Sequence, residues 1–231
     1  MKTRRLSPEL LDSLSPEDPA ARASRRDLQR LHPLLGQIGL WTRWFSENFP
    51  ARPPSSLADL GAGDGSLLGT VLLRAYPQGG HGARIFFVDR QPVVPESTLA
   101  HLRRRNWLPT VISADAPEWI EDGPPLNAVI ANLFLHHLDE PTLRRLFSSL
   151  AGKTDTFAAA EPRRGALARW GAMALFLLRC NSVTRHDARV SVEAGFTGHE
   201  IRGLWPSARG WHLQEKSVGP FTHFFFAAKT G

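Results

Sequence analysis

The chain has 231 residues, a length that buries one sizeable core but is short for two, so we predict one domain with an N-terminal appendage. Its 28 Lys and Arg residues outnumber its 22 Asp and Glu residues, and the formal net charge is +6. A basic surface can attract nucleic acid or an acidic carrier protein. However, basic clusters such as residues 103–105 lie among leucines on expected helices, which favours a solvated helix face.

Cysteine content and the N-terminal sequence bear on the compartment. Cys180 is the single cysteine, which excludes an internal disulfide framework and fits a reducing compartment. The first residues lack the apolar run of a secretory signal. The uncharged apolar stretch at residues 170–178 is far too short to span a bilayer. We therefore predict a cytoplasmic protein without a membrane span.

Residues 1–50 are predicted to form a helical appendage. Apolar residues recur at helical spacing from residue 7 to residue 49, and they include Trp41, Trp44 and Phe45. The helical pattern must stop at residues 50–56, because consecutive prolines lack the amide donor and restrict the residue before them. We place the main domain at residues 51–231.

The main domain alternates predicted strands and helices. Strands are expected at residues 56–60, 83–88, 110–114, 128–132 and 156–160, and the clearest helices at residues 67–76, 97–105 and 141–150. Such alternation implies right-handed crossovers and a parallel sheet. At the C-terminal end, strands at 211–218 and 222–229 are joined by Gly219-Pro220, which predicts an antiparallel hairpin.

The first predicted strand runs directly into the turn Gly61-Ala-Gly-Asp-Gly65. Glycine suits this turn because it adopts positive φ, where another side chain would cost about 1–2 kcal/mol, and because it lets a ligand approach the backbone. A dinucleotide-binding turn follows the pattern GxGxxG and would have its third glycine at position 66, where this chain has Ser66. The pattern here is GxGxG.

Acidic residues stand at the ends of the first three predicted strands. Asp59 lies two residues before the first glycine, where its carboxylate suits an ammonium group or the amides of the turn. Asp89 ends the second strand, and a carboxylate there can accept both hydroxyls of a ribose. Asp115 follows the third strand and offers a carboxylate to an exocyclic amine, with the small Ala116 available beside an aromatic base.

The glycine turn, these carboxylates and residues 132–137 resemble, in order and spacing, the class I S-adenosylmethionine-dependent methyltransferases, from residue 56 to the C-terminus. The resemblance implies an α/β fold with a Rossmann-like, doubly wound, seven-stranded sheet whose last strand is antiparallel. It also implies S-adenosylmethionine as the cofactor, lying over the carboxyl ends of the strands. The cofactor contacts that it implies are Asp59, Gly61, Ala62 and Gly63 by the methionyl part, Asp89 at the ribose, Asp115 and Ala116 at the adenine, and Asn132 and Leu133 near the sulfonium, together with Gly65 and Arg90.

Two further resemblances bear on the methyl acceptor. The run His136-His137-Leu138 resembles the small-molecule branch of the family, which includes quinone-biosynthesis methyltransferases. Residues 27–36, 161–164 and 191–196 resemble small bacterial methyltransferases that look like partners of polyketide-type synthases. Both resemblances imply a small, aromatic or lipophilic acceptor. Among acceptor atoms we favour oxygen over carbon.

His136 and His137 are the candidate catalytic residues. Either imidazole could act as a general base on a hydroxyl, because an unperturbed histidine accepts a proton near neutral pH. The alternative is a histidine at a helix start that bonds to the backbone. A metal site from His136, His137 and Asp139 is not expected, because adjacent residues on a helix point about 100° apart.

The acceptor is expected under a lid formed by the N-terminal helices. The helix after residues 161–164 is apolar over more than one face, so it needs cover from the core, from a partner subunit in a homodimer or from a lipophilic ligand. We favour the core. The residues expected near the acceptor are Trp41, Trp44, Arg164, Trp170 and His186.

Two other functions compete with small-molecule methylation. A nucleic-acid base methyltransferase usually has Asn or Asp, two prolines and an aromatic residue after its fourth strand, whereas this chain has Asn132-Leu-Phe-Leu there, without proline. Nucleic acid is therefore not the favoured partner. A non-catalytic nucleotide-binding module or an NAD-dependent oxidoreductase is the second rival, and the cofactor that binds would separate it from a methyltransferase.

Overall fold

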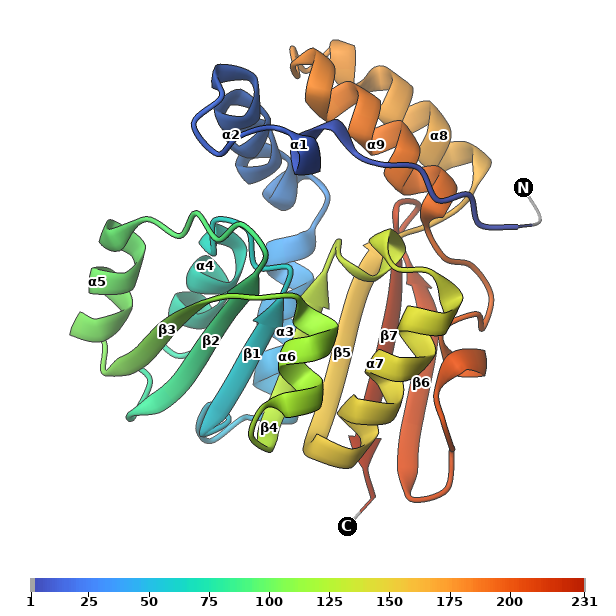
Figure 1. Ribbon diagram of the computed structural model, residues 1–231. Helices are drawn as coiled ribbons and strands as arrows, with labels where there is room; N and C mark the ends of the chain where they lie inside the picture. Colours follow the sequence, from blue (N-terminus) through green and yellow to red (C-terminus); the bar gives the residue numbers. More distant parts are fainter. Residues whose placement is uncertain (1–2, 231) are drawn as a thin grey trace.

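The computed structural model describes residues 3–230. Within them, seven strands form one sheet in the order β3-β2-β1-β4-β5-β7-β6 (Figure 1). The strands are β1 (Ser56–Leu60), β2 (Ala83–Asp89), β3 (Trp107–Ser113), β4 (Leu126–Asn132), β5 (Thr154–Pro162), β6 (Trp211–Val218) and β7 (Thr222–Lys229). Strands β1 to β5 are parallel, and β7 runs antiparallel to both β5 and β6. The predicted α/β fold with an antiparallel last strand is confirmed.

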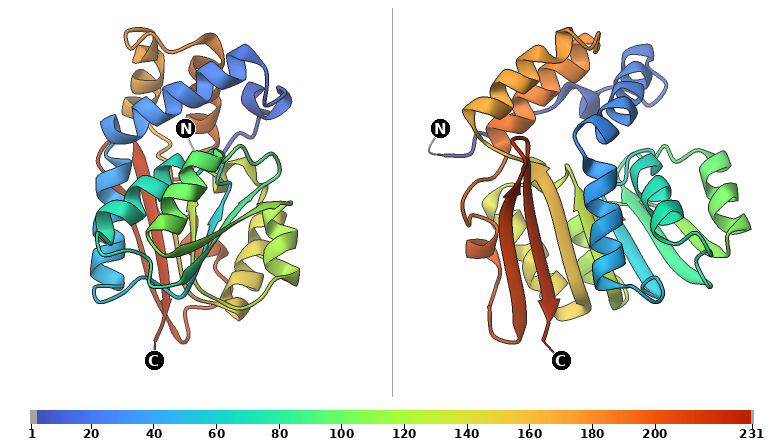
Figure 2. Two further views of the ribbon diagram at one scale, coloured as in Figure 1. Left: turned by 90° about the vertical axis from the view of Figure 1, so that its left-hand side faces the viewer. Right: turned by 180° about the vertical axis from the view of Figure 1, so that it is seen from behind.

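Helices cover both faces of this sheet and the edge at which its parallel strands end (Figures 1 and 2). They are α1 (Leu10–Ser13), α2 (Pro19–Leu34), α3 (Gln37–Asn48), α4 (Ser66–Ala75), α5 (Glu96–Arg104), α6 (Ala116–Asp122), η1 (Leu135–His137), α7 (Glu140–Lys153), α8 (Ala166–Met173), η2 (Ala174–Phe176), α9 (Ser182–Ala194) and η3 (Arg202–Leu204). Helices α3, α4 and α5 pack on one face around Trp41, Phe45 and Trp107. Helices α6 and α7 pack on the other face around Phe147 and Phe157. Because helices cover both faces of the sheet, buried residues in the central strands do not alternate with exposed ones. Strand β1, for example, is buried at every position.

Strand β3 begins at Trp107, earlier than the predicted start at residue 110. The Trp107 side chain is buried in the core, and this residue pairs with Ala83 at the start of β2. The ladder between β2 and β3 is therefore longer than predicted. Pro109 lies inside the strand, although proline cannot donate to a ladder. The sheet tolerates it because β3 is the edge strand and pairs on one side alone.

A layer of helices, formed by α1, α2, α8, η2 and α9, lies across the carboxyl ends of the parallel strands (Figure 1). We call it the helical layer. The Asp187 carboxylate on α9 accepts hydrogen bonds from the backbone N–H groups of Leu10 (2.8 Å) and Leu11 (3.0 Å). The Asp27 carboxylate on α2 accepts one from the N–H of Asn181 (2.8 Å), at the start of α9. Charged hydrogen bonds therefore join α1, α2 and α9.

Helix α3 does not belong to the helical layer. It packs along the sheet, and its Trp44 side chain, 4% exposed, is enclosed by the rings of Phe45, Phe49 and Phe226. The structure thus places Trp44, which the sequence analysis expects near the acceptor, in the core between α3 and the sheet. Of the helices predicted within residues 1–50, α1 and α2 lie over the strand ends and α3 forms part of the core.

The apolar helix after residue 165 differs from expectation. Its large side chains are exposed, among them Trp170 at 68% and Leu177 at 69%, so the prediction of core burial is wrong. The reason is that α8 contacts α9 through small side chains, Ala168 and Ala172 against Val192, and turns the large ones away. Within residues 3–230, no helix combines the length and the apolar character that crossing a bilayer requires.

Candidate functional site

The glycine turn connects β1 to α4 at the carboxyl edge of the sheet. Gly61, Gly63 and Gly65 all have positive φ, between +54° and +71°. A Cβ atom at Gly61 would lie 2.6 Å from the ring of Phe134, whereas a Cβ at Gly63 would meet nothing within 4 Å. Gly61 is therefore required by packing, and the backbone at Gly63 borders open space where a ligand can approach it.

Asp59, near the end of β1, is a buried carboxylate behind this turn. Burial, and then the negative charges of Asp89 and Asp64, raise the pKa of Asp59 to about 8. Among the described residues no basic side chain forms an ion pair with it. The Asp64 carboxylate in turn accepts a hydrogen bond from the Gln29 side chain of α2 (2.7 Å), so the helical layer touches the turn. The site thus carries negative charge that a cationic ligand would balance.

Asp89 ties the end of β2 to the glycine turn. Its Oδ2 accepts a hydrogen bond from the N–H of Gly63 (2.9 Å), and its Oδ1 accepts one from the N–H of Gln91 (2.8 Å). Because β1 and β2 are neighbours, the carboxylate lies beside the turn that the sequence places 24 residues earlier. Asp89 therefore holds the backbone of the turn against the end of β2.

Asp115 and Arg90, both expected to contact the cofactor, pair with each other. Oδ2 of Asp115 accepts from Nε (3.0 Å) and Nη2 (2.7 Å) of Arg90, and Oδ1 caps α6 by accepting from the N–H of Glu118. Ala116, the first residue of α6, is buried. Helix α6 is not among the predicted helices, because its 7 residues are too few for a clear helical periodicity.

Asn132 and Leu133 follow at the end of β4, next to β1 in the sheet. The indole Nε1 of Trp41 donates a hydrogen bond to Oδ1 of Asn132 (2.9 Å). Leu133 has a φ of +55°, a left-handed conformation that is strained for a branched residue, and its N–H donates to the carbonyl of Ala160 on β5 (2.9 Å). Trp41 therefore orients Asn132 from the core side.

His136 is buried between two carboxylates. Its Nδ1 lies 2.8 Å from Oε2 of Glu161, at the end of β5, and its Nε2 lies 3.3 Å from Oε1 of Glu9. Glu161 also accepts from the N–H groups of Phe134 (3.0 Å) and Leu135 (2.8 Å). Burial alone would lower the pKa of His136, but hydrogen bonds to Glu161 and Glu9 and their charges raise it to about 9.

His137 lies beside His136 on η1. The two rings are 4.2 Å apart between centroids and inclined by 36°, so they do not diverge as adjacent positions on a regular α-helix would. Nδ1 of His137 lies 3.4 Å from Oδ2 of Asp12, and the His137 side chain is 26% exposed. The N-terminal segment thus brings two carboxylates, Glu9 and Asp12, to the two histidines.

Sequence reasoning missed Glu161 and Glu9 as site residues. Glu161 ends the fifth strand, and the strand-end rule that selected Asp59 and Asp89 would have found it. Glu9 had no such signal, since 127 residues separate it from His136 and its place depends on how the helical layer folds back.

Three residues expected near the acceptor do not converge on the strand ends. Arg164 is buried, donates to the carbonyl of Gly195 (2.6 Å) and pairs with Glu200, so its role is structural. His186 pairs with Asp187 on α9 (3.0 Å). Trp170 is exposed on α8. With Trp44 in the core, Trp41 is the member of that group that reaches the site, through Asn132.

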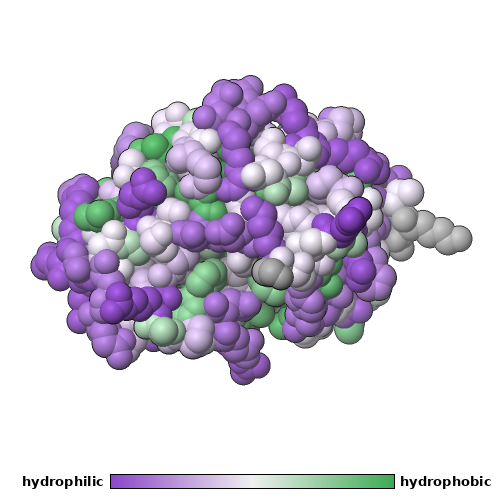
Figure 3. Space-filling view, turned by 90° about the horizontal axis from the view of Figure 1, so that it is seen from below, coloured by the Kyte–Doolittle hydropathy of each residue, from purple (hydrophilic) through white to green (hydrophobic). Residues whose placement is uncertain are grey.

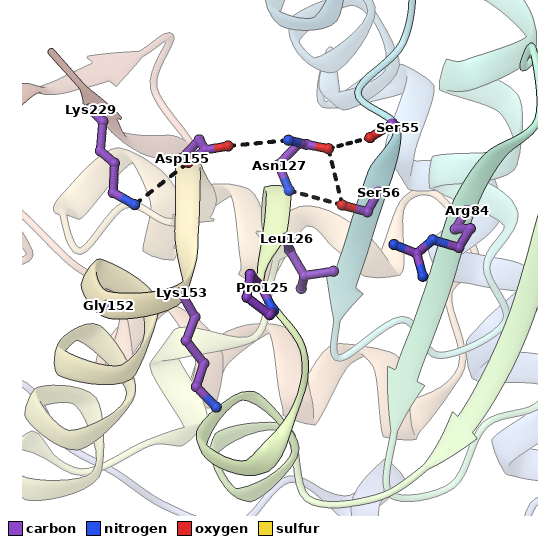
Figure 4. A pocket seen from close by; sticks show the side chains of 10 residues that line it. All are labelled: Ser55, Ser56, Arg84, Pro125, Leu126, Asn127, Gly152, Lys153, Asp155 and Lys229. Atoms are coloured by element: carbon purple, nitrogen blue, oxygen red, sulfur yellow. Dashed lines mark hydrogen bonds and ion pairs between the residues drawn. The ribbon is translucent and has the colours of Figure 1, made fainter. Parts of the chain in front are cut away.

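A separate pocket lies at the opposite edge of the sheet (Figure 4). Polar side chains at the amino ends of the strands line it, and Asn127 bonds to Ser55, Ser56 and Asp155 there. Seen from this side, apolar areas of the surface are small and separated by hydrophilic residues (Figure 3). This pocket is remote from the glycine turn, which follows the carboxyl end of β1.

No protein-family model and no curated protein matches the sequence. Solved structures of methyltransferases share its fold. The plantazolicin methyltransferase BpumL in complex with S-adenosylhomocysteine (SAH) has a TM-score of 0.65 and 12% identity, over 93% of this chain and 92% of that one. An O-methyltransferase family protein from Burkholderia thailandensis has a TM-score of 0.58 and 16% identity, over 94% of this chain and 64% of that one.

Magnesium protoporphyrin IX methyltransferase from Synechocystis PCC 6803 with bound SAH has a TM-score of 0.54 and 14% identity, over 95% of this chain and 91% of that one. The likeness spans nearly the whole chain, including the antiparallel β7. The protein therefore has the Rossmann-like fold of class I methyltransferases, as the sequence predicted.

Replacing Glu161 by Gln tests what holds the proton on His136. We expect the pKa of His136 to fall below about 9 in Glu161→Gln, because the amide keeps an acceptor oxygen but loses the charge. NMR titration of the imidazole ring protons measures it. The control Glu140→Gln removes an exposed carboxylate on α7 and should leave the titration unchanged.

The free energy of unfolding should change with pH as His136 titrates. The folded pKa of His136 is raised above its ordinary value of 6.5, so the stabilisation is complete below about pH 6.5 and is lost as the pH rises through about 9. In Glu161→Gln this decline in the free energy of unfolding should shrink. An unchanged His136 titration in the variant would contradict the assignment.

Proposed function

We propose that the protein is an S-adenosylmethionine-dependent methyltransferase that acts on a small molecule. One observation carries the proposal: the glycine turn, Asp59, Asp89 and Asp115 meet at the carboxyl ends of neighbouring strands, in a fold shared with methyltransferases. In open α/β sheets, ligands bind outside these ends where the strand order reverses. That point lies between β1 and β4, where the turn is.

The residues of the turn suit this cofactor. Gly63 leaves room for close approach, and Asp89 beside it is a carboxylate suited to a ribose diol. Asp59 suits the ammonium of the methionyl part, since it is buried beside two other carboxylates. Asp115 suits the adenine amine, and Asn132 borders the position expected for the sulfonium. When bound, S-adenosylmethionine supplies an electrophilic methyl group and a neutral thioether as the leaving group.

Charge separates this proposal from a dinucleotide enzyme. A pyrophosphate at the turn would meet the carboxylates of Asp64 and Asp89, which bond to the backbone there, and like charges in such proximity repel each other. Ser66 also stands where a GxGxxG turn needs its third glycine. The acidic environment favours a ligand with an ammonium and a sulfonium over NAD.

Structural neighbours support a small-molecule or peptide acceptor. These neighbours are a plantazolicin methyltransferase, a magnesium protoporphyrin IX methyltransferase and an O-methyltransferase family protein. We favour a small aromatic or lipophilic acceptor and an oxygen atom over carbon. Methyl transfer is an in-line displacement, so aligning the acceptor with the methyl group can supply much of the rate, up to about 7–11 kcal/mol of the barrier.

The two histidines differ in what they offer the acceptor. His136 keeps its proton below about pH 9 and is enclosed by Glu161 and Glu9, so it positions η1 and is no base at neutral pH. His137 is partly exposed next to it. We therefore assign contact with the acceptor hydroxyl to His137.

Cofactor binding provides the first test. Calorimetry should detect S-adenosylmethionine and SAH binding and no heat with NAD. Asp89→Ala should weaken SAH binding by roughly 2 kcal/mol, because a charge-assisted hydrogen bond to the ribose is lost. Asp115→Ala should cost less, since Arg90 already occupies that carboxylate. NAD binding in place of SAH would overturn the proposal.

Proton release provides a second test. The pKa of about 8 keeps Asp59 largely protonated at pH 7, and an ammonium beside it would favour the ionised form. SAH binding at pH 7 should therefore release a proton, visible as different binding enthalpies in phosphate and Tris buffers. Asp59→Asn should abolish the difference, and Asp115→Asn should retain it. Equal enthalpies for the unchanged protein would refute this role.

An acceptor screen provides the third test. Mass spectrometry of phenolic and quinone-like compounds incubated with the enzyme and S-adenosylmethionine should reveal a methylated product. For a phenol, His137→Ala should lower kcat about 100-fold, the range of general-base catalysis. A carboxylate acceptor needs no base and should be affected far less. Equal losses for both acceptor classes would remove His137 from the chemistry.

A further inference from the structure

The N-terminal segment and η1 bring together three side chains that the proposed methyl transfer does not use as a group. One ligand atom from each of Glu9, His136 and His137 lies within 4.8 Å of the other two. Glu9 comes from the segment before α1, and the histidines from the loop after β4. We propose that these three residues bind a divalent transition-metal ion of the zinc type.

An ion would take the place of the proton between His136 and Glu9, and the spacing of these two ligand atoms suits an ion. Nε2 of His136 and Oε1 of Glu9 are 3.3 Å apart. A hydrogen bond between a charged imidazole and a carboxylate is usually shorter, about 2.7–2.9 Å. Two ligands about 2.0–2.1 Å from a tetrahedral ion lie about 3.3 Å apart, the separation seen here.

Carboxylates outside the triad hold both rings in the orientation that metal binding requires. Nδ1 of His136 lies 2.8 Å from Glu161, which directs Nε2 toward Glu9. Nδ1 of His137 lies 3.4 Å from Asp12. A carboxylate that accepts from the far nitrogen of a histidine is the usual outer contact of a metal-binding imidazole. Because the two rings are inclined by only 36°, both histidines can direct a nitrogen toward one ion, although they are adjacent in sequence.

The types of ligand atom at the site restrict which ions can bind there. Two imidazoles and one carboxylate are ligands for zinc and related ions, whereas calcium and magnesium prefer oxygen alone. Three protein ligands leave the fourth position of a tetrahedral ion open to water or to an acceptor oxygen, so that the ion would replace the free imidazole of His137 as the group that contacts the acceptor. The ion would cross-link the N-terminal segment to the loop that begins at Asn132, on the acceptor side of the site.

Zinc binding to the full chain tests the proposal. Calorimetric titration with Zn²⁺ of protein stripped by a chelator should give one ion per chain. Glu9→Gln and His137→Ala should each weaken binding by roughly tenfold or more, the loss that even an outer contact of a metal causes. The matched controls are His101→Ala, an exposed histidine on α5, and Cys180→Ser, and both should bind zinc as the unchanged protein does.

Thermal melts without zinc show whether each variant folds: His137→Ala changes a partly exposed side chain and should melt close to the unchanged protein, whereas Glu9→Gln removes a charge beside the buried His136 and should melt lower. Zinc should raise the melting temperature of the unchanged protein and not that of His137→Ala. Absence of stoichiometric binding, or binding that both site variants retain, would overturn the proposal. SAH binding measured without zinc is independent of this result, so failure of the metal site leaves the methyltransferase proposal standing.

Discussion

The buried carboxylate of Glu161 is the contact on which the site depends. From the end of β5 it accepts the N–H groups of Phe134 and Leu135 and holds the ring of His136. With the N–H of His136, three neighbouring N–H groups and one imidazole therefore point at one pair of oxygens, which fixes the loop after β4. That loop positions Asn132 and Phe134 against the glycine turn on one side and η1 beneath the N-terminal segment on the other. Removing the partner of a buried charge lowers the free energy of unfolding more than removing an exposed ion pair does.

The strand ends are acidic, although the chain as a whole is basic. The protein is basic, with a net charge of +6, yet Asp59, Asp64 and Asp89 surround the turn, and burial together with the charges of Asp89 and Asp64 raises the pKa of Asp59. The excess arginine therefore lies elsewhere on the molecule and says little about the ligand. A negative pocket with one buried, partly protonated carboxylate attracts an ammonium or a sulfonium. It repels a phosphate, which is the physical reason to separate this turn from the dinucleotide turns that it resembles.

Much of the sheet could be predicted from sequence. β1, β6 and β7 have the predicted bounds, because glycine and proline mark their ends. The carboxylates at the strand ends follow from topology, since parallel strands finish at one edge. Side-chain direction could not be predicted. Trp44 and Trp170 have the same character in the sequence, yet one is enclosed in the core and the other is exposed on α8. The difference arises from α3 packing along the sheet and α8 touching α9 through alanines.

The helical layer is held by a different force from the sheet beneath it. The sheet buries large aromatic clusters on both faces, whereas the small apolar cluster between α8 and α9 consists of Ala168, Ala172 and Val192. Asp187 and Asp27 supply the cohesion instead, by accepting backbone N–H groups from α1 and from the start of α9. The layer and the N-terminal segment meet the strand ends through further polar contacts, such as those of Gln29 with Asp64 and of Glu9 with His136. Charged hydrogen bonds are worth about 1.5–3 kcal/mol each, so the contacts of the layer contribute far less to stability than the aromatic clusters beneath it.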